Sequence, residues 1–157
     1  GTGLTESDSA WIARIAARIP LVWEPNYSVG MTWLAGRLLG VALPPGFDRG
    51  ILEVHHRGKA DRPSGSARAL VEALAPPGEG SVSARGRSEA QTDVASLRLE
   101  GVPGVHQIWL TGRGEMIRIE HVVLDRAVFA RGMFAAAAAL WAEGDPTPGR
   151  RSLADLW

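Results

Sequence analysis

Residues 55–66, with the sequence HHRGKADRPSGS, bring together the groups of this chain that could do chemistry. The imidazoles of His55 and His56 can transfer protons near neutral pH, and the Lys59 ammonium can stabilise negative charge. The residues before this segment alternate with the two-residue period of a strand, and those after it have helical spacing. Groups at such a passage are held on a rigid strand and face a cleft, so the segment predicts a functional site.

The Ser64-Gly65-Ser66 end of this segment is suited to holding an anion. The first turn of a helix leaves backbone N–H groups unpaired, and the helix dipole favours negative charge there. Gly65 allows a ligand to approach the backbone closely, and the two serine hydroxyls add donors. A carboxylate or a phosphate is therefore expected. The alternative is that Ser64 only caps its own helix and that Lys59 is a solvated loop lysine.

The histidines do not predict a metal site. His106 and His121 lie on separate predicted strands and form no recognisable ligand spacing with the first pair. His55 and His56 are neighbours in a strand and point to opposite faces, so at most one enters a given pocket directly. The chain has no cysteine. This excludes disulfides, thiolate metal sites and a cysteine nucleophile, and it is compatible with the cytosol.

Composition narrows the class of protein. The chain of 157 residues has a formal net charge of +0, with 45% hydrophobic and 22% charged residues. These values are typical of a folded soluble domain and give no reason to expect nucleic acid or a membrane surface as partner. The longest apolar run, Met133–Ala142, has about half the length that spans a bilayer and predicts a buried helix.

Periodicity and turn residues predict an α+β fold with a mixed, largely antiparallel sheet packed with helices. Helices are expected over residues 5–18, from Ser28 to about 38, 64–74 and 126–142. Strands are expected over residues 21–23, 51–56, 94–100, 105–111 and 116–124. Glycine-rich links join the last three strands, which favours an antiparallel meander.

The string from Glu53 to Ala67 resembles the dihydrodipicolinate reductase motif, E-x-H-H-x-x-K-x-D-x-P-S-G-T-A, with Ser66 in place of the threonine. Asn26–Gly30 resembles the family's N-F-S-x-G turn after a Rossmann strand. Gly104-Val105-His106 and Ile119-Glu120-His121 resemble two later strand motifs. Gly1-Thr2-Gly3-Leu4 resembles the family's G-T-T-G-F turn, one residue short. The resemblance covers the whole chain, and the family's glycine-rich nucleotide-binding half is expected to be mostly absent from it.

The resemblance implies a division of the chain. Residues 1–27 correspond to the end of the Rossmann domain and residues 28–143 to the substrate-binding, catalytic and oligomerisation domain. Residues 144–157 correspond to a C-terminal tail. It also implies a cytoplasmic homotetramer or homodimer that uses NADPH or NADH to reduce a cyclic unsaturated imine dicarboxylate in lysine and diaminopimelate biosynthesis.

The resemblance also assigns roles to residues. His55 is implied as the general acid with Lys59 supporting it, while His56, Ser64, Gly65 and Ser66 would hold a substrate carboxylate. The positions that correspond to cofactor contacts are Gly1, Thr2, Gly3, Glu24, Pro25, Asn26 and Tyr27. Glu24-Pro25 departs from the small residues usual there, and Arg62 replaces the usual alanine. We expect weak or absent nucleotide binding by this chain alone.

Two other accounts are compatible with the same residues. A homologue without a Rossmann half could perform nicotinamide-free chemistry on the retained pocket, such as cyclisation, dehydration or imine protonation. A non-catalytic binding or assembly module could keep the sheet without turnover.

Overall fold

The computed structural model describes residues 4–75, 92–144 and 146–156. Three residues expected at the cofactor, Gly1, Thr2 and Gly3, lie outside this part of the chain. The described residues form two compact units. One contains the segments up to Trp33 and from Arg126 onward, and the other is Leu34–Asp125. The boundaries expected at residues 27 and 143 divide the chain by the roles that the family resemblance implies, and they stay a prediction.

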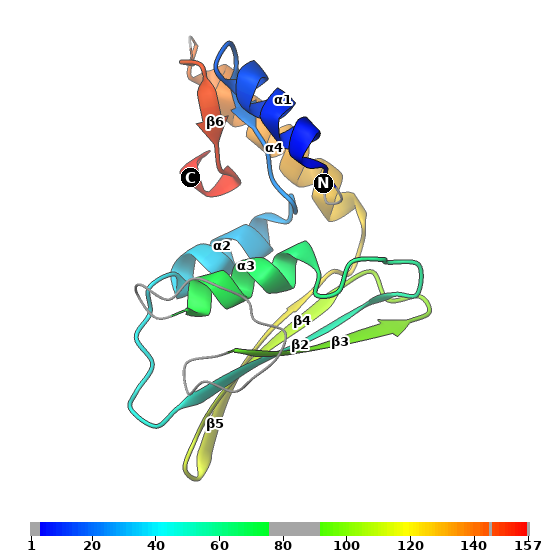
Figure 1. The fold of residues 1–157 in the computed structure, drawn as a ribbon, viewed down its shortest axis with the longest axis vertical. Coiled ribbons are helices and arrows are strands. Elements are labelled where there is room, and N and C mark those ends of the chain that lie inside the picture. The colour runs from blue at the N-terminus through cyan, green and yellow to red at the C-terminus, as the bar shows by residue number, and fades with distance from the viewer. Residues whose placement is uncertain (1–3, 76–91, 145, 157) are drawn as a thin grey trace. The chain divides into compact units, whose positions relative to one another are not determined.

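The unit Leu34–Asp125 is built on a four-stranded sheet with the order β3-β2-β4-β5. Its strands are β2 (Asp48–His56), β3 (Asp93–Leu99), β4 (Val105–Gly112) and β5 (Glu115–Val122). β2 pairs in parallel with β3 and antiparallel with β4, which pairs antiparallel with β5. Helix α3 (Gly65–Leu74) lies over one face of this sheet (Figure 1). The predicted α+β class is confirmed.

The predicted meander is wrong in one place. β4 and β5 form the expected hairpin, but β2 lies between β3 and β4. The link after β3 carries the chain past the end of β2, where a Cβ on Gly104 would lie 3.4 Å from Nε2 of His55. Glycine and proline mark that a turn occurs. They do not determine the neighbour of each strand, which is decided by the backbone hydrogen bonds and side-chain packing of the whole sheet.

The face of the sheet toward α3 carries the core of this unit. Ile51 and Ile108 are paired in register and buried, as are Leu70 and Leu74 of the helix. Arg49, near the start of β2, donates to the Leu74 carbonyl at the end of α3. The helix therefore runs back along β2, and its N-terminus lies toward the end of the strand that carries the histidines.

The opposite face of the sheet is exposed and largely apolar. Leu97 and Leu99 on β3 are 45% and 48% exposed, and Met116 and Val122 on β5 are 54% and 43% exposed. Exposed apolar side chains on a sheet face are typical of an interaction face in soluble proteins.

The other unit contains the remaining elements. They are α1 (Glu6–Ala16), β1 (Pro20–Val22), α4 (Ala127–Ala142), β6 (Gly149–Arg151) and η1 (Leu153–Leu156), and α2 (Val29–Leu38) begins in this unit. Thr5 and Asp8 form a reciprocal capping box at the start of α1, as the sequence predicts for Thr5. The predicted strand near Val22 pairs in parallel with β6, which lies in the segment expected to be a tail.

The prediction of a buried helix over Met133–Ala142 is wrong. The buried residues of α4 are Gly132 and Ala136, whereas Phe134 and Trp141 are 77% and 88% exposed. The helix packs through its small residues, because a Cβ on Gly132 would lie 1.8 Å from the Tyr27 carbonyl oxygen. An apolar run shows which side chains a helix could bury, but it does not show which other segments pack against them. Among the described segments, no helix combines the length and apolar character needed to cross a bilayer.

Candidate active site

Glu53 lies at the centre of a buried polar cluster between β2 and α3. Its Oε1 atom accepts hydrogen bonds from Ser96 Oγ (2.6 Å), Arg98 Nη2 (3.0 Å) and the Ser64 backbone N–H (3.1 Å). Burial alone would raise the pKa of Glu53, but hydrogen bonds from His55, Ser64, Ser96 and Arg98 outweigh it and hold the pKa well below its ordinary value. Glu53 is therefore a carboxylate anion inside the fold.

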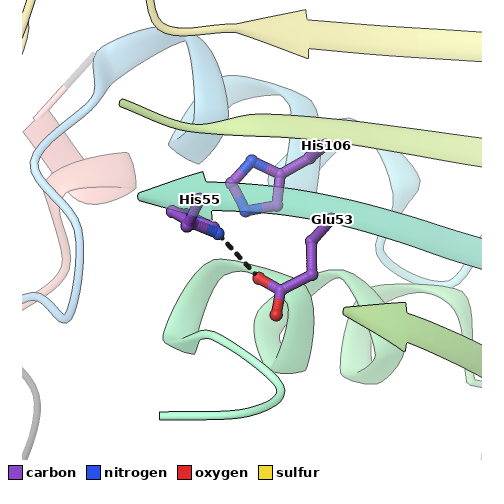
Figure 2. Close-up of side chains that lie close together, drawn as sticks. All are labelled: Glu53, His55 and His106. Atoms are coloured by element: carbon purple, nitrogen blue, oxygen red, sulfur yellow. Dashed lines mark ion pairs between the residues drawn. The ribbon is translucent and has the colours of Figure 1, made fainter. Parts of the chain in front are cut away.

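His55 is held against the other oxygen of this carboxylate. Its Nδ1 atom lies 3.0 Å from Glu53 Oε2, an ion-pair contact shown in Figure 2. The residue is 7% exposed, and its ring meets that of His106 edge to face with the centroids 5.0 Å apart. A Cβ on Gly104 would lie 3.4 Å from Nε2 of the His55 ring, so a larger residue at position 104 would crowd that edge.

His106 stands directly opposite Glu53 in the β2–β4 register and is 2% exposed. Its Nε2 atom lies 3.3 Å from Ser64 Oγ. Burial, reinforced by the neighbouring His55, lowers the pKa of His106 to about 3, so this ring is neutral at physiological pH. Burial also lowers the pKa of His121, which pairs with His106 across β4 and β5.

Glu53, His55 and His106 each place one potential ligand atom within 4.8 Å of the others. His106 lies on a separate strand from His55, as the sequence predicts, and the pairing of β2 with β4 brings the two rings to 5.0 Å between centroids. Glu53 already neutralises the Arg98 guanidinium, whose side chain is 2% exposed. A divalent cation at this carboxylate would be repelled by the buried arginine. The cluster therefore fits an internal ion pair better than a metal, and the absence of a metal stays a prediction.

The loop after β2 contains a second ion pair. Lys59 Nζ lies 2.7 Å from Asp61 Oδ1, and the Lys59 side chain is 18% exposed. Burial alone would raise the pKa of Asp61, but the ion pair with Lys59 outweighs it and lowers the pKa, assisted by the Gly65 backbone. Lys59 is therefore not a freely solvated lysine, and the Asp61 carboxylate lies at the N-terminus of α3, where an external anion was expected.

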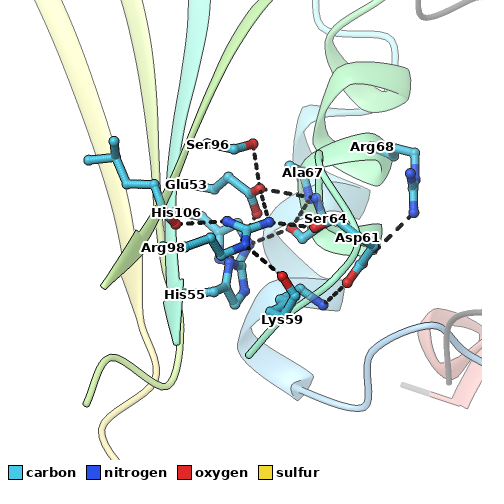
Figure 3. Close-up of polar contacts among 11 residues, drawn as sticks. Glu53, His55, Lys59, Asp61, Ser64, Ala67, Arg68, Ser96, Arg98 and His106 are labelled. Carbon is cyan, nitrogen blue, oxygen red and sulfur yellow. Dashed lines mark hydrogen bonds and ion pairs between the residues drawn. The ribbon is translucent and has the colours of Figure 1, made fainter. Parts of the chain in front are cut away.

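Arg98, on β3, connects the two ion pairs (Figure 3). Its Nε atom donates to the Lys59 carbonyl (3.2 Å), and Nη2 donates to both the Asp61 carbonyl and the Glu53 carboxylate. One buried guanidinium thus contacts the strand that carries His55 and the loop that carries Lys59.

The residues expected to hold a substrate carboxylate lie at the same end of β2. Ser64 caps α3, with its hydroxyl accepting the Ala67 N–H at 3.1 Å, so the predicted capping role is confirmed. Gly65 is the first residue of α3, and Ser66 is buried beside it. His56 is the last residue of β2, half-buried and on the opposite face from His55. The structure thus gathers His55, the Lys59 loop and the α3 N-terminus, and leaves His56 on the other side of the strand.

The stretch expected at the nicotinamide uses its polar side chains within its own unit. Glu24 Oε1 accepts the Leu153 N–H (2.7 Å), and Asn26 Oδ1 accepts the Ser28 N–H (2.8 Å). The Tyr27 hydroxyl donates to the Val22 carbonyl (2.9 Å). The cofactor contacts expected at this stretch stay a prediction.

Sequence reasoning did not select four residues of this cluster, Glu53, Asp61, Arg98 and His106. Glu53 could have been found, because it lies two residues before His55 and strand alternation places both on one face. Asp61 lies two residues after Lys59 in a short loop. No local sequence pattern pointed to Arg98, because its position beside Glu53 depends on the parallel pairing of β2 with β3.

A strand end, a charged loop and a helix N-terminus thus converge on His55 and Lys59. A family model described as "Dihydrodipicolinate reductase, C-terminus" matches residues 31–156. The chain belongs to this family, and the resemblance found in the sequence is confirmed.

Similar proteins agree with this assignment. Curated relatives described as 4-hydroxy-tetrahydrodipicolinate reductase occur in Rubrobacter xylanophilus (39% identity, 87% of this chain, 56% of the relative) and Rhodopseudomonas palustris (41%, 99% and 60%). A solved structure, dipicolinate-bound dihydrodipicolinate reductase from Paenisporosarcina sp. TG-14, has 24% identity and a TM-score of 0.65, covering 97% of this chain and 60% of its own. This likeness supports the fold. The chain therefore spans about 60% of the length of these proteins.

Proposed function

We propose that this chain is the substrate-binding and catalytic part of a 4-hydroxy-tetrahydrodipicolinate reductase. The reaction would be the NADPH- or NADH-dependent reduction of a cyclic unsaturated imine dicarboxylate in lysine and diaminopimelate biosynthesis. The single observation that carries the proposal is the pairing of His55 with Glu53 and of Lys59 with Asp61 beside the N-terminus of α3. The descriptions of the curated relatives support the same activity.

The chain's residues divide the work between proton transfer and anion binding. We assign His55 as the proton donor to the reduced ring, because Glu53 orients its imidazole from the Nδ1 side. Lys59 would stabilise negative charge on the substrate. Its ammonium has three donors, so it can keep its contact with Asp61 and still donate to a substrate carboxylate.

A dicarboxylate is the ligand class that this end of β2 is suited to hold. Ser64 caps α3 and Gly65 and Ser66 form its first turn, where the helix dipole favours an anion, and the Lys59 ammonium lies in the loop just before it. The related Paenisporosarcina protein is described as dipicolinate-bound, and dipicolinate is a planar dicarboxylate.

When bound, a nicotinamide cofactor would supply the hydride. Residues Glu24–Tyr27 would hold its nicotinamide end, with Gly1–Gly3 as further contacts implied by the family resemblance. The exposed apolar sheet face would be covered by further copies of the chain, giving a homotetramer or a homodimer. We place the enzyme in the cytoplasm, because its reduced nucleotide and its biosynthetic role belong there.

The test is an assay of the full-length natural protein with 4-hydroxy-tetrahydrodipicolinate and either nucleotide. Substrate-dependent oxidation of NADPH or NADH that falls sharply, to a residual rate, in His55→Asn and Lys59→Met supports the proposal. Conversion of the substrate without nucleotide would assign cyclisation, dehydration or imine protonation instead. Dicarboxylate binding without any conversion would point to a binding or assembly module.

A further inference from the structure

We propose that Arg98 is a positioning residue that holds both His55 and Lys59 in their working places. The inference rests on the proposed function, in which these two side chains do the chemistry. Arg98 belongs to β3 and lies far along the chain from both of them.

The guanidinium reaches both groups by short chains of contacts. On one side, Arg98 Nη2 donates to Glu53 Oε1 at 3.0 Å, and the other oxygen of that carboxylate lies 3.0 Å from His55 Nδ1. On the other side, Arg98 Nε donates to the backbone carbonyl of Lys59 at 3.2 Å. A displacement of the guanidinium is therefore passed to His55 through one carboxylate and to Lys59 through its own peptide unit.

A second contact holds the loop. Arg98 Nη2 also donates to the Asp61 carbonyl, while the Asp61 carboxylate holds the Lys59 ammonium at 2.7 Å. Each of the two proposed working groups thus has its own carboxylate partner, and both partner residues are bonded to Arg98. Nη1 completes the arrangement by donating to the Leu97 carbonyl at 2.7 Å, which fixes the guanidinium on its own strand.

The chemistry of arginine suits this role. A planar fork of N–H donors can serve several acceptors at fixed angles, whereas a lysine ammonium at the same place is a point charge that cannot span them. The Arg98 side chain is 2% exposed, so its charge is compensated by Glu53 and not by solvent. Arg98→Lys keeps the positive charge and removes the planar set of N–H donors. The variant therefore distinguishes a positioning role from charge balance alone.

The first experiment is a set of double-mutant cycles in the full-length protein. We expect Arg98→Lys to lower kcat by roughly tenfold or more, because small displacements of catalytic groups cost that much. In the His55→Asn background and in the Lys59→Met background the same change should lower kcat by less than in the wild type, because one of its two targets is gone. An Arg98→Lys protein that keeps wild-type kcat, or effects that multiply in both backgrounds, would overturn the proposal.

Arg49→Lys is the matched control. Arg49 also donates to a backbone carbonyl in the same unit, that of Leu74, at the other end of β2. We expect this variant to lose thermal stability and to keep kcat within about twofold, because the lost bond does not lead to the site. If Arg98→Lys does not fold, Glu53→Asp serves in the same cycles, since it keeps the charge and withdraws the carboxylate from His55 and Arg98.

A second readout does not depend on activity. In protein labelled with ¹⁵N-histidine, the ring nitrogens of His55 should shift in Arg98→Lys and stay unchanged in Arg49→Lys. Unchanged His55 resonances in Arg98→Lys would overturn the positioning role. A shift in Arg98→Lys together with a wild-type protein that reduces no substrate would instead overturn the proposed function alone.

Discussion

The hydroxyl of Ser64 lies between the first turn of α3 and a buried histidine. It accepts the Ala67 N–H at 3.1 Å and lies 3.3 Å from His106 Nε2. Depending on its tautomer, the neutral His106 ring accepts a hydrogen bond from this hydroxyl or donates one to it, so a single oxygen caps the helix and contacts β4. This contact ties the helix that forms the candidate anion site to the sheet beneath it.

The buried neutral His106 should make stability depend on pH. Its pKa is about 3 in the folded chain, against 6.5 as its ordinary value. As pH falls below 6.5, the unfolded chain binds a proton that the folded chain does not, so the free energy of unfolding decreases by up to about 1.4 kcal/mol per pH unit. Denaturant titrations at pH 7.5 and 5.5 should show this loss in the wild type and a smaller one in His106→Gln. Equal losses of stability in the two proteins would contradict the lowered pKa of His106.

The α3 N-terminus should bind a planar dicarboxylate such as dipicolinate. Charge-assisted hydrogen bonds contribute roughly 1.5–3 kcal/mol each, so Lys59→Ala and Ser66→Ala should each weaken binding by about tenfold or more. Arg113→Ala removes an exposed charge in the turn between β4 and β5 and should leave the affinity unchanged. Calorimetry that finds wild-type affinity in both site variants would rule out this location.

The exposed face of the sheet should mediate self-association. We expect a tetramer or a dimer by light scattering at micromolar concentration, because apolar side chains exposed on a sheet face favour burial. Met116→Glu and Leu99→Lys place charges on that face and should shift the protein toward the monomer. Leu39→Lys changes a residue that is 71% exposed and lies outside the sheet, so this variant should leave the oligomeric state unchanged. A wild-type monomer would refute the prediction.

The 157-residue chain alone should bind NADPH poorly. Dinucleotide affinity in a Rossmann domain comes mainly from the pyrophosphate at a helix N-terminus and from a residue that reads the ribose. Losing several charge-assisted contacts of roughly 1.5–3 kcal/mol should take a micromolar site to millimolar or weaker. Fluorescence titration should therefore detect no micromolar binding and assays no NADPH-dependent turnover, while dicarboxylate binding persists. Micromolar NADPH binding would show that the chain holds its cofactor in another way.

Gly132 should be intolerant of any side chain. A Cβ there would lie 1.8 Å from the Tyr27 carbonyl oxygen, so Gly132→Ala must displace α4 or the Tyr27 backbone. We expect a loss of about 1–3 kcal/mol in the free energy of unfolding. Gly36→Ala in α2 is the control, since no atom lies within 4 Å of its Cβ position, and it should stabilise the chain by about 0.5–1 kcal/mol. Equal stability changes in the two variants would contradict the close packing at Gly132.

The sequence was a good guide to local features because their causes are local. Thr5 and Ser64 cap helices through atoms within three residues, and the two-residue period of the β2 region gives the strand that carries His55. The motif from Glu53 to Ala67 also indicated the family, because the strand end, loop and helix start that it encodes are contiguous. These are features that short-range sterics and hydrogen bonding determine.

Tertiary structure decided what depends on segments far apart in the chain. The parallel pairing of β3 with β2 brings Arg98 to Glu53 and the loop, and the pairing of β4 with β2 brings His106 beside His55. The exposed positions of Phe134 and Trp141 likewise depend on what packs against α4 and not on the apolar character of its sequence. Sequence alone thus determined which residues could do the chemistry. Only the fold determined their buried partners, because strand pairing follows from the hydrogen bonding and packing of the whole sheet.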